Sequence, residues 1–400
     1  MFILYKMISR VFQNIMHWAA FFIPYRKPVL IEGPNTIDLL PTLINDQKWP
    51  LFLATDQTMR SIGILTRITD VLTKSGAKFV IFDRSVPNPT IDNIEEALSI
   101  YQSNKCGIII ALGGGSVIDL AKAVGARVAN PHKSIRDMRG VLRVGRKLPV
   151  LIAIPTTAGT GSETTLASVV TDSKTHEKYA LNDPHLIPTH VILDPTLTIN
   201  LPKKITAMTG LDALVHAVES YIGFSTTKET RKAAIEATHL IFANLPVAWN
   251  QPLDLFARGQ MQKAAFLAGL AFSRSYVGNI HALAHPLSGF YQIPHGLANA
   301  VLMPLVLDFY GDRAARRLAQ LARKAGLITI ASNDQETAKR FIEAIRNLEN
   351  QLEIPLNFGT IIQKEHIDIM SDRAFQEANP LYPVPVMMTR KDFASIYAQV

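Results

Sequence analysis

Cysteine is almost missing from the sequence, which holds a single copy, Cys106, among 400 residues. One cysteine excludes a framework of disulfide bonds. Its place in the apolar run CGIIIAL favours a buried small side chain over a thiolate nucleophile. The chain therefore suits a reducing compartment, and we expect a cytoplasmic protein.

Acidic residues are absent from residues 1–31. Basic residues are present there: Lys6, Arg10, Arg26 and Lys27. The apolar run HWAAFFIP in this segment is far too short to span a bilayer, and it lacks a small-residue cleavage site of signal-peptide type. We therefore expect no membrane span, and we interpret residues 1–27 as an extension whose helix packs its apolar side on the folded body or on a partner subunit. An amphipathic transit peptide is the alternative interpretation, and Met7 is an alternative start.

Long blocks of basic residues are also missing, although the formal net charge is +8 at pH 7. The densest basic stretch, residues 136–147, is interrupted by apolar residues, so we do not expect a nucleic-acid partner. With 48% apolar and 18% charged residues, the composition is that of an ordinary globular protein. At 400 residues the chain is too long for one compact core, which predicts two domains.

The first of these domains is predicted over residues 28–200 by short apolar runs that alternate with helical stretches. The runs read as buried strands: LFLAT (51–55), KFVIF (78–82), GIIIAL (107–112), PVLIAI (149–154) and HVILD (190–194). Helical periodicity fills the intervals: 59–75, 92–103 and 116–128. This alternation predicts an α/β domain with a Rossmann-like parallel sheet and helices on its faces.

The second domain is predicted over residues 201–400, where strand-like runs give way to alanine-rich helical segments. These segments are 206–223, 227–244, 254–273, 278–287, 296–309, 312–325 and 335–351. Their periodicity predicts an all-α C-terminal domain.

Two loops rich in small residues follow predicted strands. The first consists of Gly113, Gly114, Gly115 and Ser116. The second, PTTAGTGSETT (155–165), offers hydroxyls and amides, with Thr156 and Thr157 among them. Amides of a glycine loop at a helix N-terminus can bind an anion, and both loops leave the carboxyl ends of strands, where open α/β sheets bind ligands. We therefore predict a bound ligand that carries phosphate.

Asp56 directly follows the first predicted strand. A carboxylate at such a position can accept hydrogen bonds from a ribose diol and repel a 2′-phosphate. A helix N-cap or turn aspartate is an equally good interpretation of the position.

Five residues with metal-binding side chains fall in two short segments: Asp212, His216, His281, His285 and His295. The aspartate and the first histidine are four residues apart on a predicted helix, so they can face one spot, and the next two histidines repeat that spacing. Pro286 and Pro294 are expected to break the chain before the last histidine. Three imidazoles and one carboxylate suit Fe²⁺, Zn²⁺ or another first-row ion. The one surplus histidine would be available for proton chemistry, which points to catalysis.

Together these motifs resemble the iron-containing (group III) alcohol dehydrogenases from about Pro28 to the C-terminus. The matching stretches include VPNPT, GGGSVIDLAKA, PTTAGTGSETT, TGLDALVHAVE, AHPLSGFYQIPHGLANA and PVPVMMTR. The resemblance implies the dehydroquinate synthase-like fold of that family and a metal-dependent enzyme that interconverts a primary or short-chain alcohol and its aldehyde with NAD(H). It also implies a homodimer or a higher homo-oligomer.

The resemblance assigns roles to individual residues by motif. The implied metal ligands, for Fe²⁺ or for Zn²⁺, are Asp212, His216, His281 and His295. The implied proton-relay or substrate-orienting residue is His285. The implied NAD contacts are Asp56, Gly113, Gly114, Gly115, Ser116, Thr156, Thr157 and Lys178. Asp119 is expected to orient the glycine loop, and Phe272 and Phe290 are candidates for the walls of the substrate pocket.

Two alternatives compete with this interpretation. One is a related metal- and NAD-dependent enzyme, such as a glycerol dehydrogenase or a 3-dehydroquinate synthase, whose metal ligands differ. The other is a non-catalytic protein that binds a metal and a nucleotide as a scaffold or sensor. The extension at residues 1–27 departs from the family pattern, since many members lack it.

Overall fold

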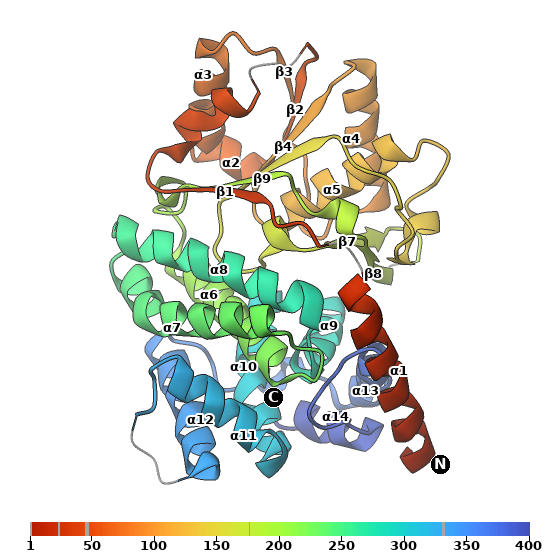
Figure 1. The fold of residues 1–400 in the computed structure, drawn as a ribbon, viewed down its shortest axis with the longest axis vertical. Helices are drawn as coiled ribbons and strands as arrows, with labels where there is room; N and C mark the ends of the chain where they lie inside the picture. The colour runs from red at the N-terminus through yellow and green to blue at the C-terminus, as the bar shows by residue number, and fades with distance from the viewer. Residues whose placement is uncertain (1, 23–24, 45–47, 176, 330–332) are drawn as a thin grey trace. The chain divides into compact units, whose positions relative to one another are not determined.

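The structure, a computed structural model, describes residues 2–22, 25–44, 48–175, 177–329 and 333–400. The chain forms two compact units. One unit, Pro24–Asn200, combines strands and helices and is called the α/β unit below. The other, called the helical unit, consists of Leu201–Val400 together with Met1–Ile23 (Figure 1). None of the helices described is both long enough and apolar enough to cross a membrane.

A parallel six-stranded sheet forms the centre of the α/β unit, with the strand order β1-β9-β6-β4-β2-β3 (Figure 1). Its strands are β1 (Val29–Glu32), β2 (Leu51–Ala54), β3 (Phe79–Phe82), β4 (Ile108–Gly113), β6 (Val150–Pro155) and β9 (His190–Leu193). Every residue of β4 is buried, which explains why its sequence is a continuous apolar run. The predicted parallel sheet is confirmed, and β1 is an additional strand that the sequence did not predict.

Helices cover both faces of this sheet. On one face, α3 (Ile64–Lys74) contributes Ile68 and Leu72 to a buried cluster that includes Ile108 of β4. On the other face lie α4 (Ile91–Ser103) and α5 (Gly115–Ala129), where Phe52 of β2 packs edge-on against Tyr101 of α4 at 5.8 Å between ring centroids. The single helix predicted for residues 59–75 is instead two helices, because α2 (Gln57–Ser61) ends in a turn before α3 begins.

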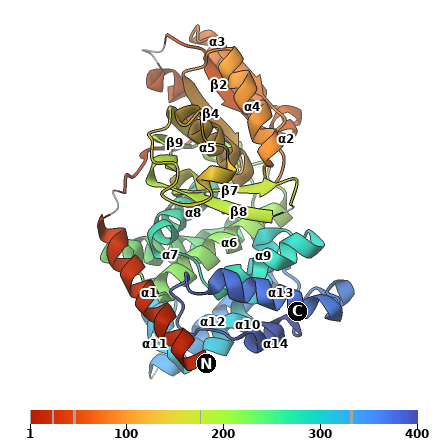
Figure 2. The ribbon, with the colours of Figure 1, turned by 90° about the vertical axis from the view of Figure 1, so that its right-hand side faces the viewer.

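A second, three-stranded sheet has the order β5-β8-β7 and packs beside α5 (Figure 2). Its strands are β5 (Gly140–Val141), β7 (Ala167–Asp172) and β8 (Glu177–Asn182), and β7 pairs with β8 in antiparallel fashion. The sequence did not predict these strands, since the side chains of β7 alternate between buried and half-buried positions and form no apolar run.

The helical unit is built around α6 (Lys203–Ile222), which is buried along almost its whole length. The helices that follow are α7 (Lys228–Asn250), α8 (Leu255–Ser275), α9 (Asn279–Tyr291), α10 (His295–Tyr310), α11 (Asp312–Lys324), α12 (Asp334–Gln351), α13 (Lys364–Ala378) and α14 (Arg390–Tyr397). The prediction that Pro286 breaks the chain was wrong, because Pro286 lies inside α9. A proline removes one backbone donor from a helix, and here the surrounding helices keep α9 continuous to Tyr291. Pro294 does precede a new helix, α10.

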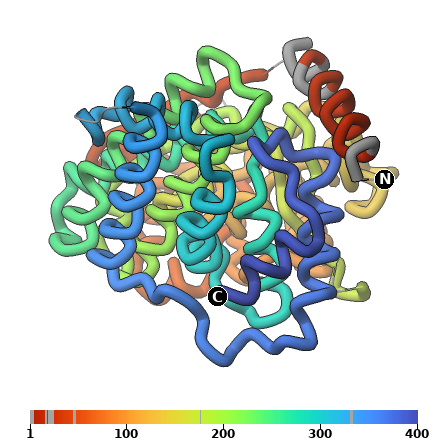
Figure 3. The backbone as a smooth tube through the Cα atoms, turned by 90° about the horizontal axis from the view of Figure 1, so that it is seen from below, coloured from red at the N-terminus to blue at the C-terminus, as the bar shows by residue number. Residues whose placement is uncertain are grey.

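The N-terminal extension forms α1 (Phe2–Phe22), which packs on the C-terminal part of the helical unit (Figure 3). The Gln13 amide donates to the carbonyls of Pro380 at 2.9 Å and Tyr382 at 2.8 Å. The ring of Tyr5 stacks on Phe375 at 5.7 Å between centroids. The helix therefore packs on the folded body, but the expectation that its apolar side makes this contact was wrong: Ser9 and Gln13 are buried, whereas Ile8, Val11 and Ile15 are exposed.

Candidate functional site

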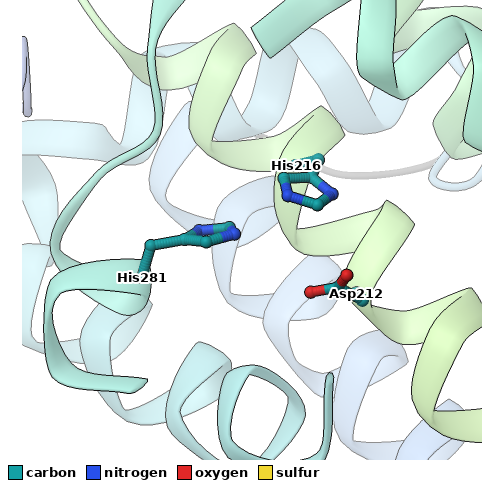
Figure 4. Close-up of side chains that lie close together, drawn as sticks. All are labelled: Asp212, His216 and His281. Atoms are coloured by element: carbon teal, nitrogen blue, oxygen red, sulfur yellow. The ribbon is translucent and has the colours of Figure 1, made fainter. Parts of the chain in front are cut away.

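A carboxylate and two imidazoles meet in the core of the helical unit. Asp212 and His216 lie one turn apart on α6, and His281 reaches the same point from α9 (Figure 4). All three side chains are buried, and one ligand atom from each lies within 4.8 Å of the others. The i,i+4 spacing on α6 thus places two potential ligands on one helix face, as the sequence predicted.

The two remaining histidines lie beside this cluster. His295 is the first residue of α10, and its Nε2 lies 3.7 Å from Asp212 Oδ1. The ring of His285 stacks on that of His295 at 5.0 Å between centroids. Gly296 allows this approach, because a Cβ at that position would lie 2.4 Å from the carbonyl oxygen of Met208 on α6. The structure therefore brings all five predicted residues together.

Glu219, which sequence analysis missed, fixes the orientation of His281. Its Oε2 lies 2.6 Å from His281 Nδ1, and its carboxylate also accepts from the backbone N–H groups of Gly278 and Ile280, at 2.7 Å each. With Nδ1 donating to Glu219, the lone pair of Nε2 is available for a metal ion. Burial lowers the pKa of His281 well below its usual value, and three neighbouring imidazoles lower it further. The ring is therefore neutral, as a metal ligand must be.

Asn299 is a second residue that sequence analysis missed, although it lies on α10 one turn after His295. Its Nδ2 donates to Asp212 Oδ1 at 2.7 Å. The same nitrogen lies 3.2 Å from Nε2 of His281 and 3.1 Å from Nε2 of His295. The amide of Asn299 thus lies between one carboxylate oxygen and two imidazole nitrogens that are all potential metal ligands. A carboxylate and imidazoles that converge in this way suit a divalent first-row ion.

His285 has a different environment from the buried histidines. Its Nδ1 lies 2.6 Å from Glu377 Oε1, and Tyr382 donates its hydroxyl to the same oxygen at 2.8 Å. The side chain of His285 is 35% exposed, whereas that of His281 is 3% exposed. The side chain of His295 is 29% exposed, so what distinguishes His285 is its pairing with Glu377 together with its contact with solvent. No local sequence signal points to Glu377, because it lies on a different helix, α13.

The two aromatic residues expected to line a pocket have other contacts. Phe272 stacks on His216 at 4.1 Å between centroids and 13° between ring planes. This packing holds the imidazole in place. Phe290 packs against His366 at 5.0 Å between ring centroids, and the guanidinium of Arg373 lies over its ring.

In the α/β unit, the two glycine-containing loops come together at one edge of the sheet. They follow β4 and β6, which are adjacent and parallel, and the Thr156 N–H donates to the carbonyl of Gly113 at 3.1 Å. Gly115 is needed here, because a Cβ would lie 2.7 Å from Thr160 Oγ1 in the second loop. The predicted phosphate-binding residues are therefore neighbours in space.

The Thr156 hydroxyl is buried and has no hydrogen-bond partner among the described residues. Buried polar groups in proteins are usually paired, so a bound nucleotide is a reasonable partner for this one. Three of the other predicted contacts, Ser116, Lys178 and Asp56, have protein partners. Ser116 Oγ accepts from the Asn88 N–H at 3.2 Å, and Lys178 Nζ donates to Asn88 Oδ1 at 2.8 Å. Asp56 is the N-cap of α2 and accepts from the Met59 N–H at 3.0 Å, so the N-cap interpretation is confirmed and a ribose contact stays a prediction.

Two charged side chains on α5, the buried Lys122 and the half-buried Asp119, position the second loop. Lys122 Nζ donates to the carbonyls of Ser162 and Thr165, at 2.5 Å and 2.9 Å, and burial lowers the pKa of Lys122 to about 8. Asp119 accepts from the Ser162 hydroxyl at 2.6 Å and from the Val169 N–H at 3.2 Å. The structural role expected for Asp119 is thus visible in its contacts. Lys122 was missed, although it belongs to the motif GGGSVIDLAKA.

Comparison with known families accounts for almost the whole chain. Residues 28–195 match the family described as iron-containing alcohol dehydrogenase, and residues 206–400 match the C-terminal part of the Fe-containing alcohol dehydrogenase family. The chain belongs to the iron-containing alcohol dehydrogenase family.

Relatives of this iron-containing alcohol dehydrogenase are similar over most of their length. The 1,3-propanediol dehydrogenase of Citrobacter freundii is 34% identical over 374 residues, which cover 92% of this chain and 95% of the relative. The NAD-dependent methanol dehydrogenase of Bacillus methanolicus is 32% identical over 359 residues, which cover 89% of this chain and 93% of the relative. A solved structure of a 1,3-propanediol oxidoreductase superposes with a TM-score of 0.90 at 32% identity, covering 94% of this chain and 99% of that one. Helix α1 lies outside both family matches, so it is a feature of this iron-containing alcohol dehydrogenase beyond the shared fold.

Proposed function

We propose that this iron-containing alcohol dehydrogenase interconverts a primary or short-chain alcohol and its aldehyde, with NAD(H) as the hydride carrier. The observation that carries the proposal is the buried convergence of Asp212, His216 and His281. The names of the relatives support the substrate class, because 1,3-propanediol and methanol are short alcohols, and one name specifies NAD. A glycerol dehydrogenase, a 3-dehydroquinate synthase and a non-catalytic binding protein are not favoured by these relatives.

The proposed metal ion is Fe²⁺, in keeping with the family name. Its proposed ligands are Asp212, His216, His281 and His295. When bound, the ion would act as a Lewis acid on the alcohol oxygen, and NAD would accept the hydride. Glu219 would hold His281 with Nε2 facing the ion, and Asn299 would hold the carboxylate of Asp212.

The proposed proton carrier is His285. Its Nδ1 faces Glu377, so the proton of the alcohol would be taken up and released at Nε2. Glu377 would keep the ring in this tautomer and stabilise the imidazolium that forms. The partial exposure of His285 supports the role, since the proton must reach solvent.

The proposed NAD site lies in the α/β unit. Backbone amides of the first glycine loop would bind the pyrophosphate at the N-terminus of α5. Thr156 and Thr157 would contact the nucleotide, and the supporting observation is that the Thr156 hydroxyl has no hydrogen-bond partner in the described part of the chain. Asp56 would accept from the adenosine ribose, and Lys178 would lie near the cofactor.

We further propose a homodimer or higher homo-oligomer, as the family resemblance implies. The proposed cytoplasmic location is supported by Cys106, a buried and unpaired thiol that suits a reducing compartment.

The decisive experiment is a turnover assay on protein that has been stripped of metal and reloaded with Fe²⁺ or Zn²⁺. We would measure NAD reduction with methanol, ethanol, 1,3-propanediol and glycerol, and NADH oxidation with the corresponding aldehydes. Metal-dependent turnover of the short alcohols is the expected result. Turnover of glycerol alone would favour the glycerol dehydrogenase interpretation, and binding of metal and NAD without any turnover would favour the non-catalytic one.

A further inference from the structure

One face of helix α1 holds the helix to the rest of the helical unit. Tyr5, Ser9 and Gln13 are spaced four residues apart, so they lie along one face. Ser9 and Gln13 are buried, and the ring of Tyr5 stacks on Phe375 of α13. The contacts that Tyr5 and Gln13 make lie in α13 and in residues 379–389, the segment that joins α13 to α14 (Figure 1).

The segment after α13 takes hydrogen bonds from α1. It contains three prolines, which have no backbone N–H, so it cannot pair its carbonyls as a helix or a strand does. The Gln13 amide donates to the carbonyls of Pro380 and Tyr382, at 2.9 Å and 2.8 Å. Arg10 donates to the carbonyl of Pro385 at 3.3 Å and to Gln13 Oε1 at 2.8 Å. Side chains of α1 thus hold the segment at three carbonyls.

Glu377 lies between two of the points where α1 makes contact. It is the second-to-last residue of α13. Phe375, on which Tyr5 stacks, is two residues before it, and Pro380, which Gln13 holds, is three residues after it. The last turn of a helix has carbonyls without partners inside the helix, and helix ends open more easily than helix centres. Contacts on both sides therefore hold the turn of α13 that carries Glu377.

We propose that Gln13 is a positioning residue for the proton carrier His285, on which it acts through Glu377. The Oε1 atom of Glu377 lies 2.6 Å from Nδ1 of His285, and a displacement of about 1 Å in a catalytic site can cost roughly a hundredfold in rate. By holding the end of α13, helix α1 keeps this carboxylate against the imidazole. The inference rests on the proposed function, in which His285 carries the proton of the alcohol. Because α1 lies outside both family matches, this support is an addition to the shared fold.

The test compares variants of the full-length, metal-loaded protein. Gln13→Met removes both donors and keeps the length of the side chain. The matched control is Asn14→Met, which makes the same kind of change at an exposed position of the same helix. Gln13→Met should lower kcat by about three- to tenfold, with little change in KM and no loss of metal. Asn14→Met should leave kcat, KM and metal content unchanged.

A double-mutant cycle with Glu377→Ala separates positioning from a general loss of structure. In the Glu377→Ala protein, Gln13→Met should have no further effect on kcat, because the carboxylate that it positions is gone. Tyr5→Leu removes the ring stacking on Phe375 and keeps an apolar side chain. It should lower kcat in the same direction, again only when Glu377 is present.

Hydrogen exchange followed by mass spectrometry examines the contact without turnover. Amides in the last turn of α13 should exchange several-fold faster in Gln13→Met than in the unmodified protein or in Asn14→Met.

The inference fails if an active unmodified enzyme and Gln13→Met have the same kcat. It also fails if the effect of Gln13→Met is equally large in the Glu377→Ala protein, or if exchange at the end of α13 does not change. An unmodified protein that turns over no alcohol with NAD and either metal would instead overturn the proposed function, and the role of Gln13 in proton transfer with it. The exchange rates would then still show whether α1 holds the end of α13.

Discussion

Nδ1 of His285 lies 2.6 Å from Oε1 of Glu377, a carboxylate carried by a helix that contributes no proposed metal ligand. This hydrogen bond fixes which ring nitrogen of His285 is available to the substrate. Glu377→Ala should therefore lower kcat by about ten- to a hundredfold, with a smaller change in KM and no loss of metal. Glu377→Gln keeps one oxygen acceptor and should recover part of the rate.

Tyr382→Phe is the control for this prediction, because it removes the second hydrogen bond to Glu377 and leaves the one to His285. Its kcat should stay close to that of the unmodified enzyme. Steady-state kinetics and elemental analysis of the four proteins decide the question. If Glu377→Ala has an unchanged kcat, or arrives without metal, Glu377 does not act through His285.

The metal ligands and His285 can be separated by metal content. His281→Ala and Asp212→Ala should each lose both bound metal and turnover, while circular dichroism shows a folded protein. His285→Ala should keep its metal and lose rate, by roughly a hundredfold or more, since it handles protons and not coordination. Elemental analysis of the purified variants gives the answer. A metal-free His285→Ala protein would mean that His285 and a neighbouring histidine have exchanged roles.

Much of the site could be predicted because its signals are local in the sequence. The i,i+4 spacing of Asp212 and His216 determines that they share a helix face, whatever the rest of the fold does. Buried parallel strands can likewise be predicted from continuous apolar runs in the sequence. Glu219, three residues after His216, had a local signal that could have been used.

The part that could not be predicted depends on how helices pack. Glu377 meets His285 across 92 positions in the sequence, and no periodicity encodes which helices become neighbours. Pro286 was misjudged for a related reason. A proline lacks one backbone donor, and tertiary packing decides whether the helix survives that loss.

Lys122 provides a test of how the nucleotide loop is held. Lys122→Met would leave the carbonyls of Ser162 and Thr165 without their buried donor. We expect a loss of about 2–4 kcal/mol in the stability of the α/β unit and at least tenfold weaker NAD binding. Metal content should not change, since the ligands lie in the helical unit. Lys74→Met, at an exposed lysine of α3, is the matched control.

Isothermal titration with NAD and thermal unfolding are the measurements for this prediction. An unchanged NAD affinity in a destabilised Lys122→Met protein would show that the lysine supports the fold alone. Loss of both NAD affinity and metal would show that the substitution unfolds the whole chain.

Glu349 on α12 predicts a pH dependence of stability. Burial raises the pKa of Glu349 to about 8, and its Oε1 has no hydrogen-bond partner among the described residues. Between about pH 4.5 and pH 8 the unfolded chain has released this proton and the folded chain still holds it. The free energy of unfolding therefore falls as the pH rises through that range. Glu349→Gln should remove this slope and gain up to about 4 kcal/mol at pH 7.5, with little change at pH 4.5.

Urea unfolding of protein with a fixed metal content, at several pH values, checks the prediction for Glu349. Glu343→Gln, at an exposed position on the same helix, should leave the pH dependence unchanged. If Glu349→Gln and Glu343→Gln behave alike, the carboxyl group of Glu349 reaches water in solution and its pKa is not raised by burial.

Asp56 decides the choice between NAD and NADP if it faces the adenosine ribose. Two unit charges about 4 Å apart repel by roughly 4 kcal/mol at an effective dielectric of 20, and solvent screening reduces this. We expect a ten- to hundredfold preference for NAD, or about 1.4–2.8 kcal/mol.

Because Asp56 also caps α2, the informative variant is Asp56→Ser, which removes the charge and keeps an N-cap acceptor for the Met59 N–H. Asp56→Ser should relax the preference for NAD without loss of stability. Asp56→Gly also removes the side-chain acceptor that caps α2. The measurement is kcat/KM with both cofactors for the three proteins. Equal use of NADP by the unmodified enzyme would leave Asp56 with its N-cap role alone, because a carboxylate beside the 2′-phosphate could not be neutral toward it.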